Sequence, residues 1–276
     1  GDCELEGFVL NVDKWREIII ENKLKKERLI EKLFMMKERT LRILAALVED
    51  FTQSATPVAS QKLLDNGKFK VSSATVRNEF SLLESVGLIH SPHTSSGKVP
   101  TQKGYRFFVD ELLDGGFRDL SADKKMISNV FAGHVQDYRS AKTKEMLFDA
   151  MRLAAQLSGN IAFCMLDHNR GFFLGLSNVL RAPEFLKNPE KAAEIIEVLE
   201  GREDFSKFLA GLELSKGAVE IFIGEENILE AVSSCGIVVS RFETEFDSGY
   251  MGLLGPMRMR YGFNRELIRN LLQMIG

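Results

Sequence analysis

Residues 71–106, VSSATVRNEFSLLESVGLIHSPHTSSGKVPTQKGYR, decide the fold of the N-terminal half of this chain. Either Ser72 or Ser73 can cap a helix, because a serine oxygen accepts from the N–H groups that the first turn leaves unpaired. Gly87 suits the left-handed residue at which a helix ends. Between these points lies an apolar stripe at roughly helical spacing, made of Phe80, Leu82, Leu83 and Val86. We therefore predict an amphipathic helix that ends at Gly87.

The residues after this helix, LIHSPHTSSGKVPT (88–101), predict two short strands joined by a loop of small residues. A helix followed by such a hairpin is the order of a winged helix-turn-helix, whose helix enters the major groove of DNA. The hairpin, or wing, then lies on neighbouring phosphates or in the minor groove. Upstream, residues 40–53 form an amphipathic helix, and Thr56-Pro57 predicts the start of a shorter one, since proline suits the first helical position. We expect this domain to span residues 37–114.

Local charge agrees with a DNA-binding domain. The whole chain has a formal net charge of -3 and an isoelectric point near 5.9, which by itself argues against nucleic acid. However, residues 66–78 and 85–109 contain no acidic side chain, and many of the aspartates and glutamates lie in residues 183–230. A surface that faces a polyanion should have such a basic composition. The basic residues in the two stretches are Lys68, Lys70, Arg77, Lys98, Lys103 and Arg106.

Each group of candidate contacts has its own chemistry. Hydroxyl groups at the helix start donate to phosphates or base edges, and Arg77 and Asn78 can bind guanine and adenine in a bidentate manner. The alternatives are a salt bridge between Arg77 and Glu84, and an internal cap for Asn78. The wing tip carries small polar residues and a lysine, and the residues after it touch the DNA backbone. The predicted DNA-binding residues are Ser72, Ser73, Thr75, Arg77, Asn78, His93, Thr94, Ser95, Ser96, Lys98, Lys103 and Arg106.

The run from residue 71 to residue 113 resembles the signature of the HrcA family of heat-inducible transcription repressors. That signature is of the type SSATIRNEM…LE..GLI..PHTSAGRIPT.KGYR.YVD. Of the differences, only Lys98 changes the chemistry, because lysine keeps the charge of the family's arginine but lacks its planar bidentate fork. The other differences are Val76 for Ile, Phe80 for Met, Ser96 for Ala and Val99 for Ile.

A second resemblance to the same family lies near the C-terminus. The segments IGEEN (223–227), CGIVVSRF (235–242) and GYMGLLGPMRMRY (249–261) resemble the family's effector domain, in the same order. Residues 120–215 match the family only loosely, so the resemblance covers roughly residues 37–276. It implies a GAF-like effector domain.

The resemblance also implies a function. It implies a cytoplasmic, homodimeric repressor of transcription that binds an inverted-repeat operator of the CIRCE type upstream of chaperone operons. Two copies related by a two-fold axis would match such a palindrome. In the family, the chaperonin GroEL promotes the active repressor, and heat stress releases it. Two alternatives stay open: a regulator whose GAF-like domain binds a small molecule, and an adaptor whose winged helix docks a protein.

The pattern changes after residue 114. Residues 115–158 are expected to form a helical connector, which either joins two copies or packs within one chain. From residue 159 to residue 276, the order of short strands and helices implies a five-stranded antiparallel sheet flanked by helices, and thus an α+β chain. Strands are expected at 161–166, 171–177, 218–224, 236–242 and 249–256, and helices at 188–199, 203–212 and 263–275.

No motif for catalysis, a cofactor or a metal is evident. We interpret Glu225-Glu226-Asn227 as a turn with a capping asparagine, and expect Arg258 to pair with Glu226 or to lie at a subunit interface. His90 and His93 lack the cysteine or carboxylate partners of a metal site. The three cysteines, Cys3, Cys164 and Cys235, are too far apart for a disulfide framework, and the last two look like buried strand residues. No segment has twenty uncharged apolar residues, so no membrane span is expected.

Residues 1–36 have no counterpart in the resemblance. They carry one strong helical pattern at about 12–34, with Trp15, Ile18, Ile19, Leu24, Leu29 and Leu33 as apolar positions. This extension is either a genuine extra helix or the product of an over-long gene start, since Met35-Met36 precedes the match. It does not have the pattern of a secretory signal.

Overall fold

The computed structural model describes residues 36–65, 69–92, 97–141, 144–166, 170–227, 229–244 and 247–275. The chain divides into two units, Gly1–Arg42 and Ile43–Gly276. The described part of the first unit is the start of helix α2 (Glu38–Ser54), so the expected N-terminal helix lies outside the described residues. The second unit contains the rest of α2 and every other described helix and strand.

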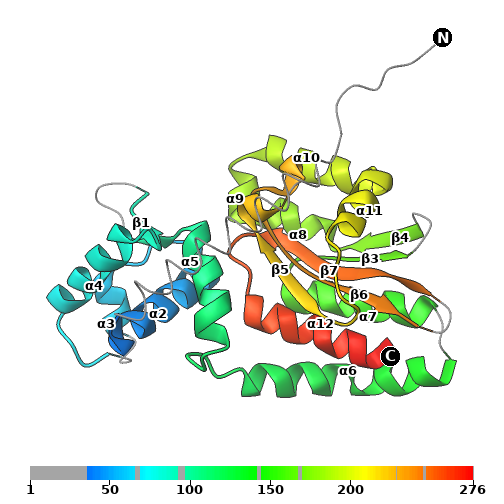
Figure 1. The fold of residues 1–276 in the computed structure, drawn as a ribbon, viewed down its shortest axis with the longest axis horizontal. Coiled ribbons are helices and arrows are strands. Elements are labelled where there is room, and N and C mark those ends of the chain that lie inside the picture. The colour runs from blue at the N-terminus through cyan, green and yellow to red at the C-terminus, as the bar shows by residue number, and fades with distance from the viewer. Residues whose placement is uncertain are drawn as a thin grey trace, which may run out of the picture. The chain divides into compact units, whose positions relative to one another are not determined.

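The first part of this unit has the predicted winged-helix order (Figure 1). After α2 come α3 (Ser60–Asp65), α4 (Ser73–Ser85), and the short antiparallel strands β1 (Ile89–His90) and β2 (Val99–Pro100). The apolar face of α2 is buried, as its sequence period predicts. Its fully or almost fully buried residues are Ile43, Leu44, Leu47 and Val48.

The prediction of a helix start at Thr56-Pro57 is wrong. The helix begins at Ser60, and Val58 is extended instead. The Val58 N–H donates to the carbonyl oxygen of Lys98 (2.8 Å), and the Lys98 N–H donates back (2.9 Å). These bonds add a third extended segment to the wing, which local helix signals do not reveal.

The chain leaves the wing through α5 (Gln102–Phe107) and a π-helix, η1 (Phe108–Leu113). Thr101 caps α5, because its hydroxyl oxygen accepts from the N–H of Gly104 (3.0 Å). A side chain at Gly104 would place its Cβ 2.0 Å from the carbonyl oxygen of Leu88. Glycine therefore lets α5 pack directly on the backbone beside the wing. Gly116, in the turn that follows η1, has a left-handed φ of 75°.

The predicted five-stranded antiparallel sheet is confirmed, in the order β4-β3-β7-β6-β5. Its strands are β3 (Ile161–Leu166), β4 (Arg170–Leu174), β5 (Val219–Ile223), β6 (Cys235–Glu243) and β7 (Ser248–Pro256). The expected strand at 171–177 ends early. Gly175, with φ of 77°, turns the chain into helix α8 (Leu176–Arg181).

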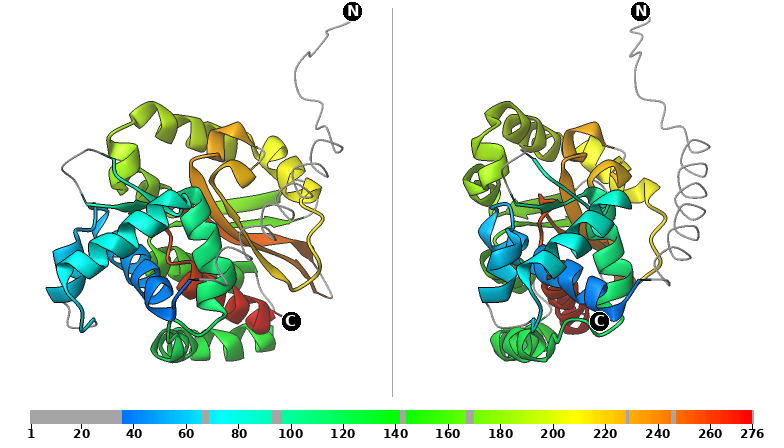
Figure 2. Two further views of the ribbon diagram at one scale, coloured as in Figure 1. Left: turned by 60° about the vertical axis from the view of Figure 1, so that its left-hand side comes forward. Right: turned by 90° about the vertical axis from the view of Figure 1, so that its left-hand side faces the viewer.

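Helices cover both faces of this sheet (Figures 1 and 2). On β4, Phe172 contacts Phe148 of one layer, and Phe173 contacts Phe205 of the other, because neighbouring strand residues point to opposite faces. One layer holds α7 (Lys144–Ser158) and α12 (Tyr261–Ile275), with α6 (Ser121–Ala141) packed on α12. The other holds α8, α9 (Pro183–Leu186), α10 (Pro189–Glu200) and α11 (Arg202–Gly211). The chain is thus α+β.

Cys164 and Cys235 lie on β3 and β6 and are fully buried, as the sequence predicts. Burial raises the pKa of each thiol to about 12. The neutral thiol is therefore the stable form at physiological pH, and both residues act as small apolar side chains.

Candidate nucleic-acid interface

Helix α4 presents one polar face and one buried face. Ser72 is its N-cap, since the side-chain oxygen accepts from the N–H of Thr75 (3.1 Å), and Gly87 has the predicted left-handed φ, 75°. Val76, Phe80 and Leu83 are buried. The prediction that Leu82 belongs to this stripe is wrong, because its side chain is 42% exposed.

The two residues predicted to read bases are both exposed on α4. Arg77 and Asn78 lie one turn behind the Ser72 cap. Within the described part of the chain, no ion pair engages Arg77, because Glu84, its expected alternative partner, binds Lys98 instead. The Arg77 carbonyl oxygen accepts from the Ser81 hydroxyl (3.1 Å), a bond that does not involve the guanidinium. Arg77 is therefore exposed on the polar face of α4, and its contact with DNA stays a prediction.

Hydroxyl groups organise the start of α4. Ser72 and Thr75 bring their hydroxyl oxygens within 3.0 Å of each other, and Ser73 approaches the hydroxyl oxygen of Ser60, the first residue of α3, at 3.1 Å. The Ser60 contact ties α3 to α4 across the turn. Sequence reasoning missed Ser60, because no local signal in the sequence distinguishes it from the other serines of the chain.

Lys98 connects the wing to α4. Its ammonium donates to Glu84 Oε2 (2.6 Å) and to the Ser91 hydroxyl (2.7 Å), and its side chain is only 20% exposed. The pKa of Glu84 is lowered, chiefly by the hydrogen bond from Lys98. Lys98, predicted as a wing-tip contact to DNA, is thus held at the base of the wing, where it links the wing to α4. The predicted tip residues His93, Thr94, Ser95 and Ser96 lie outside the described residues.

The two basic residues predicted to touch the DNA backbone differ in their surroundings. Lys103 is exposed on α5, and its ammonium donates to the carbonyl oxygen of Val86 (2.9 Å) at the end of α4. Arg106 points to the C-terminal domain, where its Nε donates to Glu226 Oε1 (2.8 Å) and its Nη2 to the Ile221 carbonyl oxygen (2.6 Å). These bonds link α5 to the C-terminal domain, and the contact of Arg106 with DNA stays a prediction.

The Glu225-Glu226-Asn227 turn has the predicted capping asparagine. The buried amide nitrogen of Asn227 donates to the carbonyl oxygens of Gly224 (2.9 Å), Val232 (3.2 Å) and Cys235 (3.0 Å). Arg258 does not pair with Glu226 as expected. It binds Glu184 instead, at 2.5 Å from Nε to Oε1.

The described residues contain no group of three His, Cys, Asp or Glu side chains placed to hold a metal ion. Among the described helices, none is both long and apolar enough to cross a membrane.

Comparison with known proteins groups the chain with one family. A family model described as the winged helix-turn-helix transcription repressor, HrcA DNA-binding, matches residues 35–112. A second model, the HrcA protein C terminal domain, matches residues 118–263. The two matches follow each other along the chain, so they cover both halves of the second structural unit.

Individual relatives point to the same family as the two models. The heat-inducible transcription repressor HrcA of Clavibacter michiganensis is 42% identical over 128 residues, which are 46% of this chain and 36% of that protein. The protein of the same name from Pseudarthrobacter chlorophenolicus is 38% identical over 54% of this chain and 42% of its own length. The chain thus spans well under two thirds of these relatives. The protein of that name from Lachnoclostridium phytofermentans is 24% identical over 85% of this chain and 95% of its own length.

A solved structure supports the fold. A crystal structure of a hypothetical protein superposes with a TM-score of 0.69 at 19% identity, and the match covers 87% of this chain and 97% of that one. At this identity the likeness concerns the arrangement of elements alone.

Proposed function

Because this chain belongs to the HrcA family, we propose that it is a transcription repressor that binds double-stranded DNA through α4 and the wing. The observation that carries the proposal is the division of α4 into two faces. Val76, Phe80 and Leu83 pack inward, while Arg77 and Asn78 are exposed with the capped helix start beside them. A recognition helix has this form, because its first turns contact base edges. The proposal gives the protein no catalytic role.

The proposed contacts divide into base readout and positioning. Arg77 and Asn78 read base edges in the major groove, where Arg matches guanine and Asn matches adenine. Ser72, Ser73 and Thr75 donate to phosphates near the helix start, and Lys103 contacts the backbone beside them. The wing tip, residues 93–96, extends the phosphate contact. In this proposal, Lys98 positions the wing through its bond with Glu84.

We further propose that two copies bind an inverted repeat of the CIRCE type, upstream of chaperone operons. A homodimer with a two-fold axis places two recognition helices on two half-sites, which must then be separated by a whole number of helical turns. The measurement is the mass of the protein alone and on a full-length operator duplex, by light scattering after size exclusion. A mass of one chain per operator would contradict this part of the proposal.

The trigger is proposed to be thermal, with recovery assisted by the chaperonin GroEL in the cytoplasm. A marginally stable domain loses its folded population steeply on heating, and the loss of the dimer weakens operator binding. Operator affinity should therefore fall near the growth limit and return when chaperonin is added. Full affinity well above that temperature, with no response to chaperonin, would contradict it.

The base-readout proposal is tested with Arg77→Gln and Asn78→Ala. Operator affinity is measured by fluorescence anisotropy on the repeat and on a scrambled duplex, with Arg202→Gln as the control. Arg202 is an exposed arginine that begins α11 in the C-terminal domain. Each α4 substitution should weaken operator binding by about 1–3 kcal/mol and reduce the preference over the scrambled duplex.

Two results would count against base readout by α4. Equal effects of Arg77→Gln and Arg202→Gln would show that α4 is not the reading element. Binding without sequence preference or salt dependence would favour the alternative in which the winged helix docks a protein.

A further inference from the structure

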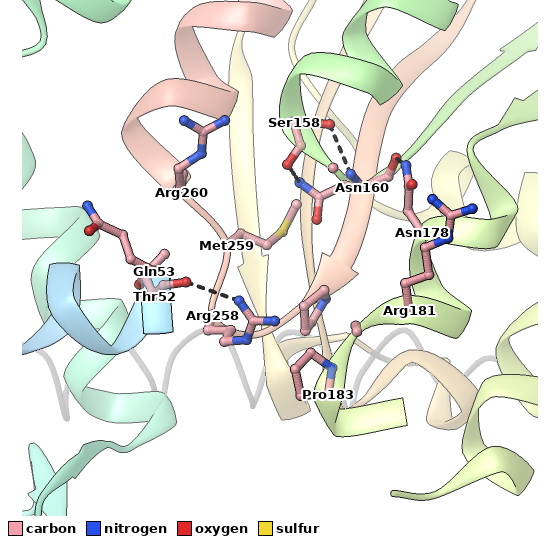
Figure 3. A pocket seen from close by; sticks show the side chains of 13 residues that line it. Thr52, Gln53, Ser158, Asn160, Asn178, Arg181, Pro183, Arg258, Met259 and Arg260 are labelled. Atoms are coloured by element: carbon pink, nitrogen blue, oxygen red, sulfur yellow. Dashed lines mark hydrogen bonds between the residues drawn. The ribbon is translucent and has the colours of Figure 1, made fainter. Parts of the chain in front are cut away.

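A cavity of about 370 Å³ lies where the end of α2, the turn between α7 and β3, helix α8 and the segment from β7 to α12 meet (Figure 3). Its walls are polar and basic. The lining residues include three arginines and no aspartate or glutamate. The polar side chains that line it are Thr52, Gln53, Ser158, Asn160, Asn178, Arg181, Arg258 and Arg260.

The side-chain amides of Asn160 and Asn178 form hydrogen bonds within the cavity wall. The Asn178 amide donates to the carbonyl oxygens of Asn160 (2.9 Å) and Ala155 (3.3 Å), and the Asn160 amide donates to that of Ser158 (3.1 Å). These bonds hold the turn after α7 in place. The part of the site formed by Asn160 and Asn178 is therefore preformed. The arginines supply the remaining hydrogen-bond donors for a ligand.

Most of the arginine donors remain after the contacts within the chain are made. Arg258 donates from Nε to Glu184 (2.5 Å) and from Nη1 to the Thr52 carbonyl oxygen (3.0 Å). Arg260 donates from Nη2 to the Leu157 carbonyl oxygen (2.7 Å). Arg181 is exposed, and no carboxylate in the described ranges pairs with it. Since each guanidinium has five N–H groups, more than half of these donors make no hydrogen bond to a described residue.

The charge of the cavity is also incompletely balanced. Glu184 pairs with Arg258, whereas no carboxylate among the described residues forms an ion pair with Arg181 or Arg260. The Arg260 guanidinium lies 3.9 Å above the ring of Phe263, and burial lowers its pKa, which Asp123 opposes and Arg118 reinforces. Burying a cation without a full counter-charge is costly, and an anion beside it would offset that cost.

We propose that this cavity binds a small organic anion carrying a phosphate or carboxylate group, held by Arg181, Arg258 and Arg260. The guanidinium fork matches both groups in a bidentate manner, and the volume falls in the range of small-molecule sites. Thr52 and Gln53 come from α2 of the winged helix, while the arginines come from the C-terminal domain. An occupant would therefore contact both domains. This goes beyond the proposed repressor function, which requires no such ligand.

The test is thermal unfolding of the full chain with potassium phosphate, potassium citrate or potassium chloride at matched ionic strength. Phosphate, citrate or both should raise Tm with a saturable dependence, whereas chloride should not. Saturation by phosphate alone assigns a phosphate ligand, and saturation by citrate alone assigns a carboxylate ligand. The absence of a saturable shift with both anions overturns the proposal.

Two matched pairs of variants locate the site. Arg181→Gln should raise the apparent Kd of the effective anion about tenfold, the loss expected for one charge-assisted hydrogen bond, while Arg202→Gln should leave it unchanged. Gln53→Glu places a negative charge in the wall and should weaken binding, unlike Gln156→Glu on the exposed side of α7. Tm without added anion shows that each variant folds. If Arg181→Gln binds the anion as Arg202→Gln does, and Gln53→Glu binds it as Gln156→Glu does, the anion binds elsewhere and the proposal is contradicted.

Discussion

Arg106 and Glu226 form a bidentate ion pair between the helix that follows the wing and the turn that follows β5. Arg106 Nε donates to Glu226 Oε1 (2.8 Å), and its Nη2 donates to the other carboxylate oxygen. Glu226 also accepts from the N–H of Ile223 (2.8 Å). The side chains are 29% and 18% exposed, so water screens the pair only in part. This pair links the DNA-binding half of the chain to its sheet.

Breaking this ion pair should lower the free energy of unfolding by more than breaking an exposed ion pair. We expect a coupling energy of about 1–3 kcal/mol from the double-mutant cycle of Arg106→Gln and Glu226→Gln, measured by urea unfolding. The Lys207–Glu203 pair is the control, because its side chains are 59% and 66% exposed. Its cycle should give a much smaller coupling energy, because water screens an exposed pair. Additive effects of the two single substitutions at Arg106 and Glu226 would contradict the linking role.

The same geometry separates two basic residues of α5 in DNA binding. Lys103→Gln should reduce the slope of log affinity against log salt by about 1, the value for one lost phosphate contact. Arg106→Gln should leave that slope unchanged, because Glu226 already engages the guanidinium. The measurement is operator anisotropy across a salt series for both variants. A reduced slope for Arg106→Gln would mean that the residue leaves Glu226 when DNA binds.

The Glu84–Lys98 bond should make the stability of the wing depend on pH. Because the pKa of Glu84 is lowered in the folded state, its stabilisation is present above the ordinary value of 4.5 and is lost as the pH falls through the folded pKa. We expect the difference in Tm between the unmodified chain and Glu84→Gln to be small and positive at pH 7, since Glu84 is 39% exposed. The difference should disappear at strongly acidic pH.

The control for this pH series is Glu200→Gln. Glu200 is an exposed carboxylate at the end of α10, and it makes no ion pair with a described residue. A difference in Tm for Glu84→Gln that does not change with pH would argue against the role of this bond.

Two glycines beside the wing should respond differently to alanine. Gly87 has a left-handed φ of 75° and open space around it, so Gly87→Ala should cost only the backbone strain, about 1–2 kcal/mol. Gly104→Ala should cost more, on the order of 3 kcal/mol, because its Cβ would meet the Leu88 carbonyl oxygen at 2.0 Å. Chemical denaturation of both variants checks the order. A smaller loss for Gly104→Ala would show that α5 shifts easily.

Local signals in the sequence predicted the elements that depend on neighbours along the chain. Helix α4 begins after Ser72 and ends before Gly87 as expected, and short apolar runs located the strands of the sheet. The failures involve partners that are distant in sequence. Val58 is extended because it pairs with Lys98, and this pairing overrides the proline signal beside it.

The candidate site shows the same division. Arg77 and Asn78 are exposed as predicted, because the period of α4 determines its outward face. A basic stretch predicted a DNA contact for Arg106, yet its side chain pairs with Asp110 on the next turn and with Glu226, which lies 120 residues further along the chain. Likewise, the basic cavity combines Arg181 with Arg258 and Arg260, which no local pattern brings together.

The most direct test of the account is binding of the purified protein to a CIRCE-type inverted repeat and to a scrambled duplex of the same length, across a salt series. We predict tight binding to the repeat, much weaker binding to the scrambled duplex, and a steep loss of affinity as salt rises. Equal, weak binding to both duplexes with little salt dependence, in the presence of chaperonin as well as without it, would contradict a DNA-binding repressor.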